Sequence, residues 1–330
     1  MLKPSMRPLS GRIVFNEAVA AAGAHPSAVA QGLPRAMQGA KRASPSPAPV
    51  APFRGLSTLW IQITGTWCNL ECRHCINASG PRSPWLKPLG AEPIRRAIAE
   101  AEEAGVKEIY FTGGEPFLHG EILPLLDLAL RVAPTTVLTN GTLIGPEQAD
   151  ALAAMAARAP YSLEIRVSLD DTDREKNDRI RGEGAWTKAL EAVRLLRARG
   201  LLPIVTATEI TRGEHPAGPG MYERFRDFLH REGVERPRVK IMPVFALGRL
   251  PANGEPPLTE QDLEGFDRSV LQCADGRVVT AGGVYACPIL AGFAGARLST
   301  GSLAESFKPA SLYHPAYVTC RDTGMTCRNG

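Results

Sequence analysis

The amino-acid sequence predicts an α/β protein organised around one curved, mostly parallel sheet. Between residues 56 and 250, short apolar strand patterns alternate with amphipathic helix patterns, giving six strand–helix units in all. Repetition of this kind produces parallel strands joined by right-handed crossovers, with helices covering the sheet. Because six units are too few for a closed eight-stranded barrel, we expect an open (β/α)6 partial TIM barrel.

Local signals place each unit. The first strand pattern, 58–65, alternates large apolar and polar residues, and the helix that follows it stops at Gly105. Pro146 opens a later helix, because proline is favoured in the first helical turn. The other strands are expected at 107–112, 135–139, 163–169, 203–209 and 238–242, and the helices at 91–104, 120–132, 146–158, 186–199 and 221–232.

Two shorter regions flank this core of residues 56–250. Residues 1–55 are rich in Ala, Pro, Ser and Gly, with seven Lys or Arg against one acid. This composition is typical of a disordered basic extension, with a transit peptide as the alternative. The net charge of this extension is +6. Because the net charge of the whole chain is +4, the remaining residues carry a net charge of −2. A near-neutral core argues against a nucleic-acid groove, and no apolar run approaches the roughly 20 residues that span a membrane. Residues 251–330 are expected to form a small cysteine-rich domain.

The seven cysteines divide into a cluster of three and a later group of four. Cys68, Cys72 and Cys75 fall in the loop that leaves the first expected strand. Close thiolates are a soft ligand set for an iron–sulfur cluster or for zinc. A [4Fe–4S] cluster normally takes four cysteines, so three from one loop leave one iron free to chelate a small molecule. Clustered free thiols in an odd number also favour a reducing, cytoplasmic location.

This Cys-x3-Cys-x2-Cys loop resembles the signature of the radical S-adenosylmethionine (SAM) superfamily. His74, which we count among the cofactor-binding residues, holds the place of the usual aromatic residue. The resemblance implies that the open iron binds the amino and carboxylate groups of SAM. An electron from an external donor of the flavodoxin or ferredoxin type then cleaves SAM to a 5′-deoxyadenosyl radical, which abstracts a hydrogen atom from the substrate. A zinc knot is the alternative interpretation of the same cysteines.

A glycine motif stands where the second expected strand ends, and ligands gather at the carboxyl ends of strands in parallel α/β folds. Gly113 and Gly114 let the backbone approach a ligand closely, and Glu115 adds an anion. The resemblance implies that these three residues hold the methionine amino group of SAM. A simple glycine-rich turn is the structural alternative.

Three more side chains are candidates for contact with SAM. Asn140 follows the third strand and borders the expected SAM pocket, or else only shapes a turn. The resemblance implies that Ser168, at the end of the fourth strand, bonds the SAM ribose or carboxylate. Arg181 carries a guanidinium suited to a bidentate bond with the SAM carboxylate, although a surface position is equally compatible with the sequence.

The substrate end of the site is less defined. Glu209 or Thr208, at the end of the fifth strand, is expected at the mouth of the barrel. Glu209 is the candidate general base if burial raises its pKa, and a solvated carboxylate otherwise. Gly248 and Arg249 follow the sixth strand and resemble a Gly-Arg pair that relatives carry near the adenine end of SAM.

The later cysteines suggest a second metal site. Cys273 and Cys287 flank two short alternating runs joined by Ala-Gly-Gly, which predicts a hairpin, and Cys320 and Cys327 follow. This arrangement resembles the SPASM/twitch extension of radical SAM enzymes. A full SPASM domain needs about seven cysteines for two clusters, so four imply the shorter twitch form with one auxiliary [4Fe–4S] cluster. A four-thiolate zinc site and structural thiols are the alternatives.

Together these features predict a radical SAM enzyme acting on a small, natural-product type molecule by net oxidation or epimerisation. If all four later cysteines bind metal, oxidation is favoured, unless Tyr285, Tyr313 or Tyr317 donates a hydrogen atom. A ribosomally made peptide or protein is the alternative substrate, disfavoured because residues 1–55 are too short and too rich in Pro and Ala for a winged-helix leader-binding module. A non-catalytic zinc or iron–sulfur interaction protein is the alternative from another class.

Overall fold

A computed structural model describes residues 48–82, 84–209 and 220–324 of the 330-residue chain. Its centre is a nine-stranded sheet in the order β10-β9-β8-β2-β3-β4-β5-β6-β7, in which β2 to β8 pair in parallel. The first six of these parallel strands are β2 (Thr58–Gln62), β3 (Glu108–Thr112), β4 (Thr135–Thr139), β5 (Leu163–Ser168), β6 (Ile204–Thr208) and β7 (Arg238–Met242). The strands that the sequence predicted are therefore confirmed, and the expected open partial barrel is observed.

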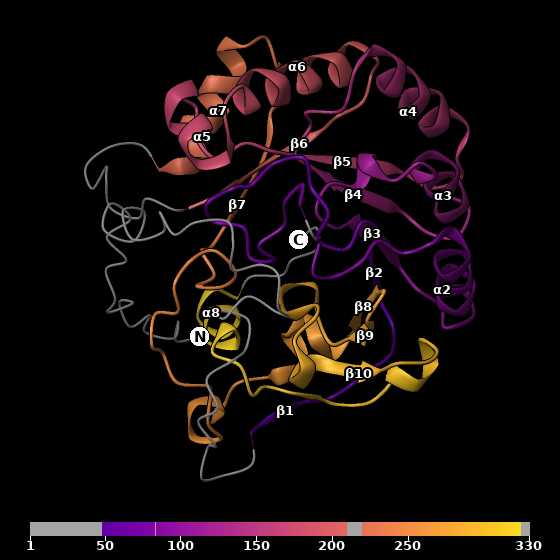
Figure 1. Cartoon of the computed structure of the whole chain (residues 1–330), viewed down its shortest axis with the longest axis vertical. Helices are drawn as coiled ribbons and strands as arrows, with labels where there is room; N and C mark the ends of the chain where they lie inside the picture. The colour runs from indigo at the N-terminus through magenta and orange to yellow at the C-terminus, as the bar shows by residue number, and fades with distance from the viewer. Residues whose placement is uncertain (1–47, 83, 210–219, 325–330) are drawn as a thin grey trace.

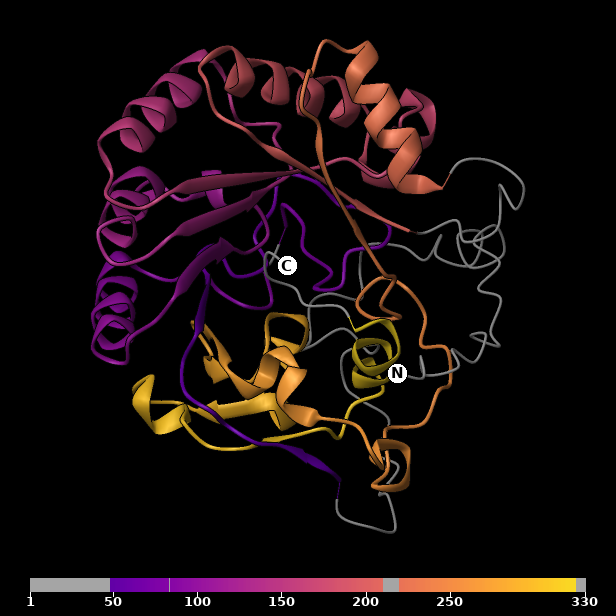
Figure 2. The same ribbon diagram turned by 180° about the vertical axis from the view of Figure 1, so that it is seen from behind.

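Helices cover the outer face of this sheet and follow its curve (Figures 1 and 2). They are α2 (Ala91–Glu103), α3 (Ile122–Ala129), α4 (Pro146–Arg158), α6 (Ala185–Ala198) and α7 (Met221–Arg231). The helix α5 (Arg174–Arg181) was not predicted, because its composition is almost entirely polar; Asp173 caps it by accepting from the Lys176 amide. None of the described helices is long and apolar enough to cross a membrane.

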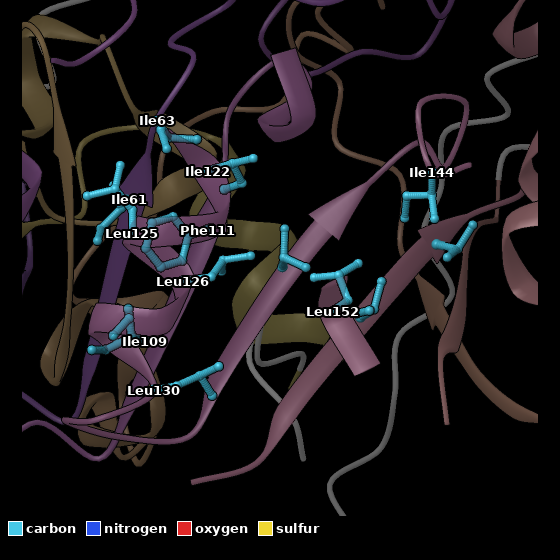
Figure 3. Close-up of a cluster of buried hydrophobic side chains, with 14 of the residues drawn as sticks. Ile61, Ile63, Ile109, Phe111, Ile122, Leu125, Leu126, Leu130, Ile144 and Leu152 are labelled. Atoms are coloured by element: carbon cyan, nitrogen blue, oxygen red, sulfur yellow. The ribbon is translucent and has the colours of Figure 1, made fainter. Parts of the chain in front are cut away.

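Side chains on the two faces of β2 and β3 pack into two different apolar clusters. Ile61 and Phe111 point to the helix side, where they pack with Leu125 and Leu126 of α3 (Figure 3). The neighbouring Trp60, like Tyr110 on β3, belongs to a second apolar cluster that is built mostly by the C-terminal segment. This alternation is the normal result of successive side chains pointing to opposite faces of a strand.

The C-terminal segment fills the concave side and extends the sheet. The predicted hairpin is confirmed as β8 (Gly276–Thr280) and β9 (Gly283–Tyr285), and β8 adds to the free edge of β2 in parallel. The segment ends with β10 (Arg297–Ser299), β11 (Ala310–Ser311) and α8 (Ala316–Thr323), and β11 pairs with β1 (Val50–Ala51). Strands from both sides of the boundary predicted at residue 250 thus belong to the same nine-stranded sheet, and the boundary itself stays a prediction. The extension predicted for residues 1–55 lies mostly outside the described residues.

Candidate metal centre

The first three cysteines lie in a loop whose base is closed by backbone pairing. After β2 ends, Trp67 forms a parallel bridge with Gly80. The Cys68 amide donates to the Gly80 carbonyl at 3.1 Å, and the Gly80 amide donates to the Thr66 carbonyl at 3.1 Å. The chain between these contacts curls back on itself, so all three cysteines belong to one loop anchored at the carboxyl edge of the sheet.

Backbone N–H groups are directed at two of the three sulfurs. The Leu70 amide donates to Cys68 Sγ at 3.4 Å, and the Ser79 amide donates to Cys75 Sγ at 3.3 Å. Such bonds tune iron–sulfur sites. Burial raises the pKa of Cys68 to about 12 and that of Cys72 to about 11. Metal binding must therefore displace a proton from these thiols, as it does at thiolate sites generally.

The loop offers three thiol ligands for a metal site. Three close thiolates are a soft ligand set, suited to an iron–sulfur cluster or to zinc. In the described ranges, no group of three or more His, Cys, Asp or Glu side chains is arranged to hold a single metal ion.

The glycine turn after β3 packs directly on this loop. A Cβ on Gly114 would collide with the Trp67 carbonyl oxygen and approach the Cys68 amide, and Gly113 has a φ of +155°. The Glu115 amide donates to the Trp67 carbonyl at 3.0 Å. Glycine is required here because two backbone segments touch, so the motif that was predicted to approach a ligand also supports the cysteine loop.

Glu115 is fully buried, and its carboxylate joins the ends of β3 and β4. The Thr139 hydroxyl and the Phe117 amide donate to Oε1 at 2.7 and 3.1 Å, and the Asn140 amide donates to Oε2 at 2.8 Å. Burial raises the pKa of Glu115 to about 7, although the three hydrogen bonds act in the opposite direction. The side chain is therefore engaged by protein donors in this structure.

Asn140 links the end of β4 to the cysteine loop. Its Nδ2 donates to Asn69 Oδ1 at 2.9 Å and lies 3.8 Å from Cys68 Sγ. Its Oδ1 accepts from the Thr142 amide, and Asn69 Nδ2 donates to the Thr142 hydroxyl at 2.8 Å. Asn69 and Thr142 were not among the predicted site residues; their only sequence signal is that they stand beside predicted ones.

A buried ion-pair group stands on the other side of the loop. The Asp170 carboxylate lies 2.7 Å from Arg181 Nε and 3.2 Å from His74 Nε2, and it accepts from the Thr208 amide at 2.9 Å. Burial alone would raise the pKa of Asp170, but Arg181, His74 and the Thr208 N–H together hold it below its usual range. The Cys72 thiol donates to the Arg181 carbonyl at 3.8 Å. Arg181 thus lies at the ligand loop, with Asp170 as its charge partner.

Ser168 and Glu209 stand at the ends of the neighbouring strands β5 and β6. Ser168 is half-buried and pairs in register with Thr206. Glu209 is also half-buried, and its amide donates to the Met242 carbonyl at 2.9 Å. Both residues occupy the predicted edge of the sheet, and their roles in binding or catalysis stay predictions.

Gly248 and Arg249, which follow β7, pack directly against the cysteine loop. The Arg249 amide donates to the Cys75 carbonyl at 3.1 Å, and its guanidinium donates to the Cys72 carbonyl at 3.0 Å. This contact was not foreseen, because 177 residues separate Arg249 from Cys72 and no local pattern spans such an interval.

Three of the four later cysteines gather in the C-terminal apolar cluster. Cys273 precedes β8, Cys287 follows β9 and both are buried, whereas Cys320 on α8 is half-buried. Burial raises the pKa of Tyr317, and the three nearby thiols add to this shift. The structure therefore brings these three cysteines into one apolar cluster, which also contains Tyr317. Cys327, the fourth predicted ligand, lies outside the described residues.

A buried cation stands beside this second group. Arg277 is fully buried on β8, and its guanidinium lies 4.1 Å from the centre of the Phe53 ring. Its hydrogen-bond acceptors are the carbonyl oxygens of Cys273, Gly276, Ser306 and Lys308. Burial lowers the pKa of Arg277 to about 10, and nearby thiolates would oppose that shift. An anionic group held by Cys273 and Cys287 would compensate this charge.

Comparison with known proteins gives the class. Residues 63–221 match the model of the radical SAM superfamily. This segment, which contains the cysteine loop, the glycine turn and strands β3 to β6, is therefore a radical SAM domain.

Two curated relatives show how far the similarity extends. The chain is 29% identical over 310 residues to mycofactocin maturase MftC of Mycobacterium tuberculosis, which covers 82% of this chain and 76% of MftC. It is 27% identical over 216 residues to GTP 3′,8-cyclase of Moorella thermoacetica, which covers 64% of this chain and 63% of the cyclase.

Solved structures share the fold. Native anSMEcpe with bound AdoMet superposes with a TM-score of 0.57 at 15% identity, covering 76% of this chain and 80% of that one. Native anSMEcpe with bound AdoMet and Cp18Cys peptide gives a TM-score of 0.56 at 15% identity, covering 82% and 84%. The predicted fold, an α/β partial barrel of the radical SAM type, is confirmed.

Proposed function

We propose that this protein is a radical SAM maturase, in which Cys68, Cys72 and Cys75 hold a [4Fe–4S] cluster and the substrate is a peptide. One observation carries the proposal: a single loop at the carboxyl edge of the sheet presents three cysteines, with backbone N–H groups directed at two of the sulfurs. Bound there, the cluster would supply the electron that cleaves SAM to a 5′-deoxyadenosyl radical. The chain's own task is to orient SAM against one C–H bond and to exclude water.

The strand ends around the loop are suited to hold SAM. We assign the methionine end of SAM to the backbone of Gly113 and Gly114. Glu115 would hold this turn in place, and Asn140 would border the pocket. His74 Nδ1 is buried and has no hydrogen-bond partner among the described residues, which leaves it available to a ligand.

The remaining polar groups complete this assignment. Arg181 would add positive charge towards the SAM carboxylate while Asp170 orients it, and Ser168 would bond the ribose or carboxylate. Glu209 remains the candidate general base at the mouth of the barrel. These roles rest on position at the carboxyl edge of the sheet.

The relatives favour a peptide as the substrate class. The relative that aligns with 82% of this chain is named a maturase, and the anSMEcpe fold has been solved with AdoMet and a peptide together. A small molecule is the second candidate, supported by the similarity to GTP 3′,8-cyclase. Peptide-rich and small-metabolite fractions of a cell extract separate the two, because only the fraction that contains the substrate should accelerate 5′-deoxyadenosine formation.

We further propose that Cys273, Cys287, Cys320 and Cys327 hold an auxiliary [4Fe–4S] cluster in a twitch-like segment. The first three share one apolar cluster with Tyr317, beside the buried guanidinium of Arg277, which supports this site. An auxiliary cluster would supply a one-electron acceptor, which suits net oxidation better than epimerisation. The first electron would come from an external donor of the flavodoxin or ferredoxin type, in the cytoplasm.

Anaerobic reconstitution tests the proposal. About seven to eight irons per chain supports both clusters, and about four supports the first alone. With dithionite and SAM, the reconstituted chain should form 5′-deoxyadenosine. Zinc as the only bound metal, or intact SAM under strong reductant, would overturn the enzymatic proposal.

A further inference from the structure

We infer that Arg249 is a positioning residue for the catalytic cysteine loop: it fixes the turn that directs the Ser79 N–H at Cys75 Sγ. Arg249 follows β7, at the opposite edge of the parallel strands from β2, where the loop begins. Its neighbours Leu247 and Leu250 are both buried, and Leu247 belongs to the C-terminal apolar cluster, so the backbone around Arg249 is anchored beside the loop.

The guanidinium joins the two limbs of the loop. Arg249 Nη1 donates to the Cys72 carbonyl at 3.0 Å on the outgoing limb. Nη2 donates to the carbonyls of Ser79 at 2.6 Å and Ala78 at 3.3 Å on the returning limb. The planar guanidinium of arginine has donors on both terminal nitrogens and can make these three contacts at once. The single ammonium group of a lysine could make only some of them.

The residue before Arg249, Gly248, lets the backbone of this segment also touch the cysteine loop. Gly248 has a φ of +65°, and a Cβ there would collide with the carbonyl oxygens of Cys75 and Ile76. The Arg249 amide donates to that same Cys75 carbonyl at 3.1 Å. Arg249 and its own backbone therefore hold the carbonyls of two of the three proposed cluster ligands.

The returning limb contains a strained turn that these bonds stabilise. Ala78 has a φ of +48°, a region that non-glycine residues adopt only at a cost. Its conformation places the next amide, that of Ser79, 3.3 Å from Cys75 Sγ. Nη2 of Arg249 donates to the Ala78 carbonyl, which precedes this amide, and to the Ser79 carbonyl, which follows it. Loss of these two bonds would let the turn relax and the Ser79 N–H move away from Cys75 Sγ.

The charge of Arg249 acts on the same ligands. Its guanidinium lies against the Cys72 and Ser79 carbonyl oxygens, so a positive charge stands beside the ligand loop. A cation beside thiolate ligands and a hydrogen bond to a ligand sulfur both stabilise the more reduced, more negative state of an iron–sulfur site. Losing both contributions should shift the midpoint potential in the negative direction and loosen the bound iron.

A matched control exists within the loop. Arg73 carries the same charge and lies between Cys72 and Cys75 in sequence, but its side chain is exposed. Within the described ranges its side chain forms no hydrogen bond or ion pair, and only its backbone amide donates, to the Ile180 carbonyl. Replacing Arg73 removes a cation next to the ligands while the contacts between the limbs stay intact.

The test compares the full-length, anaerobically reconstituted wild type with Arg249→Ala, Arg249→Lys and Arg73→Ala. The reduced EPR signal that changes on addition of SAM identifies the catalytic cluster. Two quantities are followed: its midpoint potential, and its rate of loss in the presence of an iron chelator. We expect Arg249→Ala to lose the signal about 10 to 100 times faster, with a more negative potential. Arg249→Lys should fall between it and the wild type, and Arg73→Ala should match the wild type.

Two results would overturn the inference. One is an Arg249→Ala protein with native far-UV circular dichroism, unchanged potential and unchanged iron loss. The other is an equal effect of Arg73→Ala, which would show that any nearby positive charge suffices. If Arg249→Ala does not fold, Arg249→Lys decides the question, because a lysine variant that holds iron as the wild type does would show that the fork between the limbs is not needed.

Discussion

The two groups of cysteines in this chain differ in the groups that surround them. In the first group Cys68 is buried and Cys72 and Cys75 are half-buried, with the cations Arg181 and Arg249 acting on Cys72. Cys273 and Cys287 are buried in an apolar cluster, with Arg277 as the nearby cation. The first group stands at the edge where parallel strands end, and the second stands inside the C-terminal core.

This difference separates an open site from a closed one. A site that must admit a ligand needs polar groups that can exchange partners, and the loop around His74 offers them. A site closed by apolar packing excludes ligands and suits a structural or electron-transfer role. This difference agrees with the proposal that SAM binds at the first group of cysteines, and it predicts that substitutions in the two groups have different consequences.

The largest expected effect separates the two groups directly. Cys72→Ala should abolish the dithionite-dependent cleavage of SAM, because the proposed cluster loses one of its three ligands. Cys320→Ala should leave cleavage detectable but uncoupled from substrate. Chromatographic measurement of 5′-deoxyadenosine and of product gives both quantities. Unimpaired cleavage in Cys72→Ala would refute the ligand assignment.

A second large effect is expected at the glycine turn. Gly114→Ala places a Cβ against the Trp67 carbonyl oxygen, so the end of β3 and the cysteine loop must separate. We expect a reconstituted protein that keeps its secondary structure but binds little iron at the first site. Gly120→Ala is the matched control, since nothing lies within 4 Å of a Cβ there. Equal iron contents in the two variants would mean that the turn does not support the loop.

The sequence was sufficient to predict what depends on local pattern. The six strands β2 to β7 and the five predicted helices between them follow from the alternation of apolar residues and from glycine and proline signals, and the hairpin of β8 and β9 from two short runs around Gly282 and Gly283. The polar helix α5 was missed because it lacks an apolar face. Its Arg181 and Asn177 are buried by contacts with the loop around Asp170 rather than by a hydrophobic core.

Contacts between distant segments could not be predicted in the same way. The cysteines, Glu115, Asn140 and Arg181 were singled out individually, but their partners follow only from the fold. Neither the role of Glu115 as a bridge between strand ends nor the position of Arg249 across the cysteine loop leaves a mark in local sequence. The sequence thus identified the polar residues of the open site, and the structure supplied the network that joins them.

The ion-pair group offers a smaller, quantitative test of how the open site is supported. Asp170→Asn keeps the shape of the side chain but leaves the buried Arg181 without its counter-charge. Breaking a buried pair in this way typically costs about 3 to 5 kcal/mol of unfolding free energy. Urea unfolding of the apo chain measures it. The exposed pair of Asp150 and Arg199 is the control, and Asp150→Asn should change the unfolding free energy little. Similar small losses in both variants would show that Asp170 does not hold this side of the loop together.

The smallest effect concerns Glu115 and depends on pH. Burial raises its pKa from 4.5 to about 7 in the folded chain. Between these values the folded state binds more protons than the unfolded state, so the stability contributed by Glu115 is fully present below pH 4.5 and is lost as the pH rises through about 7. Glu115→Gln resembles the protonated form and lacks this titration. The difference in unfolding free energy between wild type and variant should therefore change by ~3 kcal/mol across the window, to the disadvantage of the wild type at higher pH. Because other titrating groups cancel in this difference, a difference that does not vary with pH would show that the carboxylate stays charged at the strand ends, held by its three donors.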